Sequence, residues 1–228
     1  MLAVALGLAV AGACGFEWKM VQLPGGLYVD PATDERARAA VSQAWTTGAE
    51  KVRDFYGSLR SDLPDGYFCN SDTCRVYFSG KYMRSSFMLG MNEGDFLAAR
   101  QSIIIAFIDE RMPRVIAHEI AHSELEERIA PNPVPAWFNE GLATYVAGEP
   151  ACPRNMPDGV ADLRPLTEGN AWMSNTNGPR GHAIYCQAMR EVTAWLAKNG
   201  KPGLERLLLQ IKDGTRFSVA YGPMAIQP

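Results

Sequence analysis

The chain has 228 residues and 47% of them are hydrophobic, which is enough to bury one good core. Its formal net charge of -3 excludes a strongly basic surface, and no cluster of lysine and arginine occurs along the sequence. Nucleic acid is therefore not an expected partner.

The first thirteen residues, "MLAVALGLAVAGA", carry no charged side chain and end in small residues directly before Cys14. This pattern predicts a secretory leader over residues 1–13, which is too short to span a bilayer as a helix. The alternative is a buried N-terminal element of a cytosolic protein, because no lysine or arginine precedes the apolar run. Small residues before a cysteine also resemble a bacterial lipoprotein processing site, so a lipid anchor at Cys14 is the one membrane attachment expected. The remainder, residues 14–228, is predicted to form a single domain.

Two short strands and a long helix are predicted after the leader. Apolar and polar residues alternate over 16–23, and a Pro-Gly-Gly turn leads from there into a second strand at 27–29. Asp30 is a candidate N-cap with a proline after it, and apolar residues at helical spacing predict an amphipathic helix that extends to Tyr56.

Further strands precede a helix that contains two of the three histidines. Aromatic and β-branched residues predict strands at 66–69 and 74–80, and the apolar run in 102–109 is typical of a strand buried on both faces. The histidine helix begins near Pro113 and becomes charged in its second half, which we expect to face solvent. A proline-rich bend at 131–135 ends it.

The C-terminal half is predicted to be mostly helical. A helix over 135–146 is closed by Gly148, a long loop extends to residue 179, and two helices follow at 181–198 and 202–212. Strands first and helices afterwards predict an α+β fold with a zincin-like arrangement, in which a small mixed sheet packs on the histidine helix.

Four cysteines follow Cys14, an even number that predicts two disulfides and an oxidising compartment. Cys69 and Cys74 flank the turn-forming residues "NSDT", so a hairpin there would bring them close enough to bridge. By elimination Cys152 would pair with Cys186, although four cysteines permit three pairings. Structural zinc is the weaker alternative, because the spacing is not that of a zinc-binding cysteine set. We expect an exported protein: periplasmic, in the cell envelope or secreted.

The segment "RVIAHEIAHSEL", residues 114–125, contains the H-E-x-x-H pattern of a catalytic metal site. On a helix, His118 and His122 lie on one face with Cβ atoms about 6 Å apart, so both imidazoles can reach one ion. Glu119 lies at the rim of that face, where it can act as general base on a water at the metal. The competing interpretation is an ordinary helix in which this sequence pattern occurs by chance.

The segment "PAWFNEGLATY" supplies Glu140 as a third ligand. Seventeen residues separate it from His122, and a chain that turns back at the proline-rich bend would bring its carboxylate level with the histidines. Two imidazoles and a carboxylate with one open position form the catalytic type of zinc site, so Zn²⁺ is the expected cofactor.

"HEIAH" followed by "WFNEGLATY" resembles the gluzincin metallopeptidases, and the second motif is similar to the W-L-N-E-G-F-A signature of the aminopeptidase N group. The resemblance implies a minimal single-domain gluzincin, with His118, His122 and Glu140 as zinc ligands and Glu119 as catalytic base. It also implies an oxyanion-stabilising residue on a later helix, for which Tyr185 is the first choice and His182 the second. The exopeptidase motif G-x-M-E-N is absent, which leaves endopeptidase and exopeptidase action open.

The expected function is hydrolysis of peptide bonds by a metal-activated water, with a peptide or protein as substrate. The alternative is a non-catalytic, zinc-containing protein of the cell envelope that binds peptides or a partner. The sequence does not indicate an oligomeric state.

Overall fold

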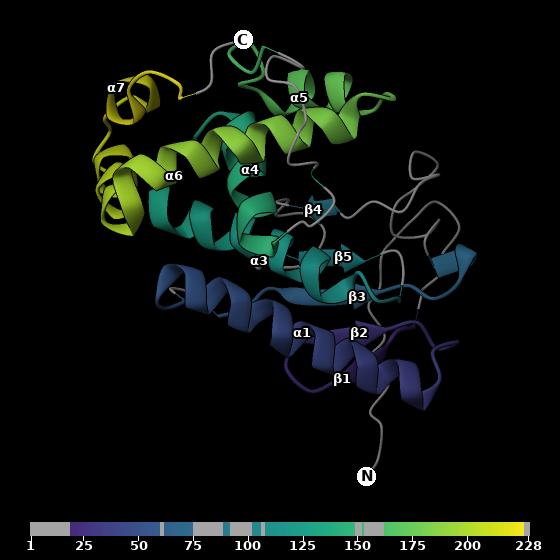
Figure 1. The fold of residues 1–228 in the computed structure, drawn as a ribbon. Coiled ribbons are helices and arrows are strands. Elements are labelled where there is room, and N and C mark those ends of the chain that lie inside the picture. Colours follow the sequence, from purple (N-terminus) through teal and green to yellow (C-terminus); the bar gives the residue numbers. More distant parts are fainter. Residues whose placement is uncertain are drawn as a thin grey trace. The chain divides into compact units, whose positions relative to one another are not determined.

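Figure 1 shows the fold in a computed structural model, whose packing divides the chain into two compact units that we describe separately. The predicted leader, 1–13, and Cys14 lie outside the described residues. In strands β4, Leu89–Met91, and β5, Ser102–Ile105, the backbone alone is described. The structure describes residues 19–59, 62–74, 89–91, 102–105, 108–148, 152 and 162–225.

The first unit contains a mixed sheet, as predicted for an α+β fold. Its strand order is β1-β2-β3-β5-β4, with antiparallel pairing at both ends and parallel pairing of β2 with β3 and of β3 with β5. The strands are short, as expected for a small sheet: β1 Val21–Leu23, β2 Leu27–Val29, β3 Asp65–Phe68, β4 Leu89–Met91 and β5 Ser102–Ile105.

Helix α1, Glu35–Tyr56, packs against this sheet through Trp45. A Cβ atom added at Gly66 of β3 would lie 2.7 Å from the Trp45 ring, so the glycine makes room for the indole. Likewise a Cβ at Gly48 would lie 2.5 Å from Cγ2 of Ile116, which brings α1 close to the first part of α3, Met112–Ile129. Both contacts lie inside the first unit.

The predicted N-cap of α1 at Asp30 is wrong. The backbone N–H of Ala37 donates to Oδ1 of Asp34 at 2.8 Å, so the helix is capped four residues later than predicted. Asp30 is buried instead, and its carboxylate accepts hydrogen bonds from the backbone N–H of Ala32 and from the backbone N–H and hydroxyl of Ser71. Both aspartates have the local chemistry of a cap, and the distant Ser71 decides between them.

The second unit is helical. It contains the second part of α3, followed by α4 Ala136–Ala147, α5 Gly169–Thr176, α6 Gly181–Lys212 and α7 Phe217–Tyr221. Helix α4 ends at Gly148 in the left-handed conformation, as predicted. Helix α6 is interrupted at Gly200, whose φ is 65°, so the two predicted helices are confirmed as two helical stretches with a break between them.

Two predictions for this part of the chain are wrong in part. The loop predicted over 148–179 contains α5, a helix that buries Trp172 as its one fully buried side chain and therefore has no clear apolar periodicity. The charged half of α3 does not simply face solvent, because Glu124 is 2% exposed and forms an ion pair with Arg128 at 2.6 Å. The guanidinium of Arg128 also lies over the ring of Tyr56, and burial raises the pKa of that phenol.

The bend after α3 is anchored by a side chain. Nδ2 of Asn132 donates to the carbonyl oxygens of Ile211 and Lys212 at 2.9 and 3.1 Å, which caps the end of α6. The first N–H groups of α4, at Ala136 and Trp137, donate to carbonyl oxygens of the segment before α5. The start of α4 is thereby held by contacts with the end of α6 and with the segment before α5.

Both predicted disulfides are present, Cys69–Cys74 in the first unit and Cys152–Cys186 in the second. Disulfides of this kind are typical of proteins in an oxidising environment. The hairpin predicted between these two cysteines is wrong, because residues 72–74 are helical and β3 pairs in parallel with β2 and β5 on its two sides. The strand predicted at 74–80 lies, beyond Cys74, outside the described residues. Within the described part of the chain, no helix combines the length and the apolar character needed to cross a bilayer.

Candidate metal centre

The motif residues of helix α3 lie on a partly exposed face because the apolar residues between and beside them are buried in the core. Its apolar neighbours are fully buried: Ile116, Ala117, Ile120 and Ala121. The motif side chains are half-buried, which keeps them in contact with solvent while the helix is held by packing on its other positions.

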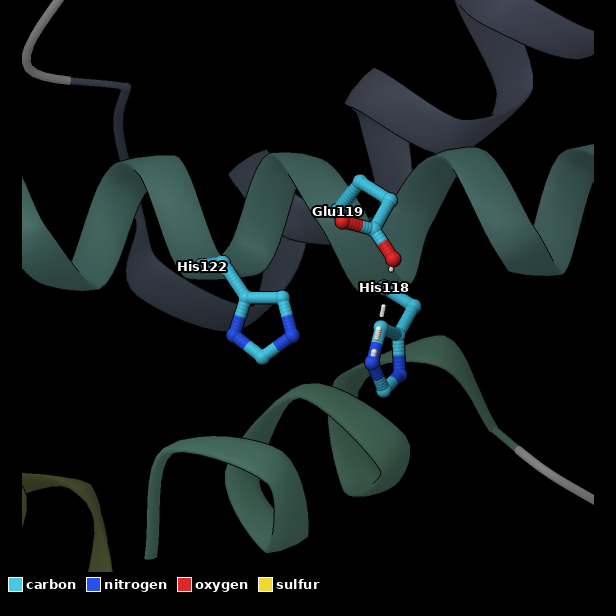
Figure 2. A group of neighbouring side chains, drawn as sticks. All are labelled: His118, Glu119 and His122. Atoms are coloured by element: carbon cyan, nitrogen blue, oxygen red, sulfur yellow. Dashed lines mark ion pairs between the residues drawn. The ribbon is translucent and has the colours of Figure 1, made fainter. Parts of the chain in front are cut away.

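His118, Glu119 and His122 form a group that can hold a metal ion. One ligand atom from each lies within 4.8 Å of those of the other two, and Oε1 of Glu119 is 4.0 Å from Nε2 of His118. Figure 2 shows both imidazoles on the same side of the helix, one turn apart. Because all three residues belong to one continuous helix, this arrangement follows from helical geometry alone.

Glu140 of α4 lies beside His122 within the second unit. Its Oε2 is buried and lies 3.6 Å from Nε2 of His122. Two atoms that bind one tetrahedral zinc ion are about 3.4 Å apart, given metal–ligand distances of about 2.0–2.1 Å. The spacing of this histidine and carboxylate therefore fits a shared metal ion.

Asn139 is a site residue that the sequence analysis did not single out. Its Oδ1 lies 2.6 Å from Nδ1 of His122. An amide oxygen can only accept a hydrogen bond, so this contact favours the tautomer with the proton on Nδ1, which leaves the lone pair of Nε2 for a metal. The signal available in the sequence was its position directly before Glu140, which places both residues at the start of α4.

The two candidate oxyanion residues lie at the start of α6, as predicted from the sequence. The ring of Tyr185 packs edge-on against Trp172 with centroids 4.9 Å apart, which holds the phenol in a defined orientation. His182 is exposed, and its Nε2 lies 3.6 Å from Sγ of Cys186 in the disulfide. Their part in stabilising an oxyanion stays a prediction.

The group formed by His118, Glu119 and His122 can hold a metal ion, and Glu140 and Asn139 each contact a ring nitrogen of His122. No protein-family model matches the sequence, and no curated protein is significantly similar to it. The resemblance to gluzincins is carried by the two sequence motifs.

Proposed function

We propose that this protein is a zinc-dependent peptidase of the gluzincin type, exported from the cytoplasm. The observation that carries the proposal is the approach of Glu140 to His122 from a separate helix, at 3.6 Å. Chance occurrence of H-E-x-x-H on a helix would not bring a third ligand, with its own neighbouring asparagine, to the second histidine.

His118, His122 and Glu140 would hold the metal. Two neutral nitrogens and one carboxylate suit Zn²⁺, and three protein ligands leave one position for a water or a substrate. When bound, zinc lowers the pKa of a coordinated water and polarises the carbonyl group of a substrate. The hydrogen bond from His122 to Asn139 keeps the second imidazole in the tautomer that this role requires.

Glu119 serves as the general base in this proposal. It is 11% exposed and its Oε1 lies 4.0 Å from Nε2 of His118, beside the histidine that we propose as a ligand. Its carboxylate accepts the proton of the attacking water and passes that proton to the departing amine. Tyr185, or His182 as second choice, donates a hydrogen bond to the oxyanion that forms between these two steps.

The substrate class is a peptide or an unfolded protein in the compartment where the disulfides form. A leader over 1–13 and a lipid anchor at Cys14 would deliver the protein there. The alternative role, a zinc-containing protein that binds peptides without cleaving them, uses the same ligands and differs in turnover alone.

The test uses the purified protein with denatured casein and a library of quenched fluorescent peptides. We expect one zinc per chain, cleavage that a chelator abolishes and restored cleavage when zinc is added back. In the Glu119→Gln variant, turnover should fall by a factor of about 10³ or more while zinc stays bound, because the amide cannot accept the proton. Cleavage by the Glu119→Gln variant at the wild-type rate would refute the assignment of Glu119 as general base. Zinc binding without cleavage by the wild-type protein would favour the binding role.

A further inference from the structure

The short helix α7 packs against the part of α4 that carries Asn139 and Glu140. The ring centroid of Tyr221 lies 5.5 Å from that of Trp137 and 5.6 Å from that of Phe138. Phe217 contacts the same two rings at 5.8 and 5.0 Å. Because Trp137 and Phe138 directly precede Asn139, the backbone of the ligand-bearing turn is held by these ring contacts.

A buried carboxylate holds α7 in this position. Glu191 of α6 is 0% exposed, and its Oε1 accepts hydrogen bonds from the hydroxyl of Tyr221 at 2.9 Å and from the backbone N–H of Ala225 at 2.7 Å. Nε1 of Trp195 donates to the carbonyl oxygen of Tyr221 at 3.1 Å, and the two rings stack at 5.1 Å. A carboxylate with such donors is a strong acceptor, and its burial makes these contacts costly to break.

The opposite constraint on α4 comes from Gly141. A Cβ atom there would lie 2.5 Å from the carbonyl oxygen of Ala188 in α6, so the two helices are in backbone contact one residue after Glu140. The turn with Asn139 and Glu140 is therefore confined between the aromatic contacts that precede it and the helix contact that follows it.

We infer that residues 217–225, which we name the C-terminal clasp, position Glu140 and Asn139 for metal binding, with Glu191 as the positioning residue that anchors the clasp. The inference rests on the proposed metal centre. It adds to that centre a side chain, Glu191, that does not itself contact the metal. Glu191 accepts a hydrogen bond from Tyr221, and the Tyr221 ring packs on Phe138. Phe138 is two residues before Glu140, so the backbone connects this packing to the proposed ligand. Small displacements of a ligand matter here because metal affinity depends on ligand placement to a few tenths of an ångström.

The test measures zinc affinity by competition with a chromophoric chelator, and the visible spectrum of the protein loaded with Co²⁺. We expect Glu191→Ala to weaken zinc affinity by about tenfold, which is the lower end of the range for groups that orient metal ligands, and to change the Co²⁺ spectrum. Glu191→Gln retains an oxygen that accepts the two hydrogen bonds, so it should restore most of the affinity and the wild-type spectrum. Glu205→Ala, on an exposed part of the same helix, is the matched control and should bind zinc as the wild type does.

A purely structural role for Glu191 predicts another outcome. The midpoint of thermal unfolding would fall in Glu191→Ala, while zinc affinity and the Co²⁺ spectrum well below that midpoint would equal those of the wild type, and this result would overturn the inference. Should Glu191→Ala fail to fold, Tyr221→Phe takes its place, because it removes one hydrogen bond and keeps the ring; zinc affinity unchanged in Tyr221→Phe would then overturn the inference. A wild-type protein that binds no metal would overturn the metal centre itself, and the positioning role with it, so the two failures are distinguishable.

Discussion

At the scale of single residues, His122 is the side chain on which the metal centre depends most, because both of its ring nitrogens face a specific partner. Nδ1 lies 2.6 Å from Oδ1 of Asn139, and Nε2 lies 3.6 Å from Oε2 of Glu140. The two partners are neighbours in the sequence and come from the same turn of α4. One turn of helix thus supplies both the carboxylate that we propose as a third ligand and the amide that contacts the other ring nitrogen of His122.

Replacing Asn139 by alanine should weaken zinc affinity by about 10- to 100-fold, because the imidazole of His122 loses its orientation and its preferred tautomer. The free energy of unfolding of the metal-free protein should change by about 1 kcal/mol or less, since one partly buried hydrogen bond is lost. Asn139→Asp keeps an acceptor at the same position and should retain tight binding. Isothermal titration with zinc checks both variants, and equal affinities for Asn139→Ala and the wild type would contradict the proposed role.

At the scale of secondary-structure elements, the packing of α4 on α6 determines where Glu140 lies. Figure 1 shows the two helices side by side in the second unit. They approach closely because position 141 carries no side chain: a Cβ there would be 2.5 Å from Ala188 O and 3.1 Å from Cγ2 of Val192. The obstacle includes backbone, which cannot turn aside as a flexible side chain would.

Gly141→Ala should therefore destabilise the protein although alanine favours helix. An overpacking cost of about 1–3 kcal/mol outweighs a gain in helix propensity of up to about 1 kcal/mol over most of that range, so we expect a net loss of about 1 kcal/mol and at most about 2 kcal/mol. Gly169→Ala in α5 is the control, because a Cβ there meets nothing within 4 Å and should change stability by less than about 0.5 kcal/mol. Urea unfolding of the two variants measures the difference. A Gly141→Ala protein as stable as the control would show that α4 can move away from α6.

At the scale of the whole molecule, the two disulfides constrain loops of very different length. Cys69 and Cys74 are 5 residues apart, whereas Cys152 and Cys186 are 34 residues apart. The entropy that a cross-link removes from the unfolded chain grows with the length of the loop that it closes. The second disulfide also joins the segment after α4 to α6, the helix that carries Tyr185 and Glu191.

Removal of the long-range disulfide in Cys152→Ser/Cys186→Ala should lower the free energy of unfolding by about 4 kcal/mol, against about 2 kcal/mol for Cys69→Ala/Cys74→Ala. Alanine suits Cys69, Cys74 and Cys186 because all three positions are 0% exposed. Urea unfolding under non-reducing conditions gives the two values. A larger loss for the short loop would contradict the chain-entropy argument and point to native contacts made by that loop.

Features with a local cause could be predicted from the sequence. The i, i+4 spacing of His118 and His122 places both on one face of any helix that contains them, and Gly148 ends α4 because glycine adopts the left-handed conformation without strain. The break between the last two predicted helices was visible in "NGKP", since glycine and proline both disfavour a continuous helix. Both disulfide pairings were predicted correctly, although Cys69 and Cys74 are joined beside a helical stretch at 72–74 and not across the predicted hairpin.

Features with a distant cause could not be predicted in the same way. Asp30 and Asp34 are both suitable N-cap residues for α1 by their local sequence. Asp34 is the cap, and the carboxylate of Asp30 instead accepts a hydrogen bond from Ser71, which is distant in the sequence. The sequence predicts Glu124 at the surface. In the structure it is buried and paired with Arg128, whose guanidinium lies over the ring of Tyr56. Short α5 is stabilised by burial of one tryptophan, which leaves no periodic pattern to detect.

The metal centre divides along the same line. The sequence by itself determined the histidine pair and the glutamate beside it, because residues on one helix keep their mutual geometry wherever that helix lies. Only the tertiary structure decided that Glu140 lies near Nε2 of His122 and that Asn139 contacts Nδ1 of the same ring. It also decided that Glu191 accepts a hydrogen bond from Tyr221 in the C-terminal clasp. These contacts depend on the path of the bend after α3 and on helix packing, which are set by the sum of many weak interactions between residues distant in the chain.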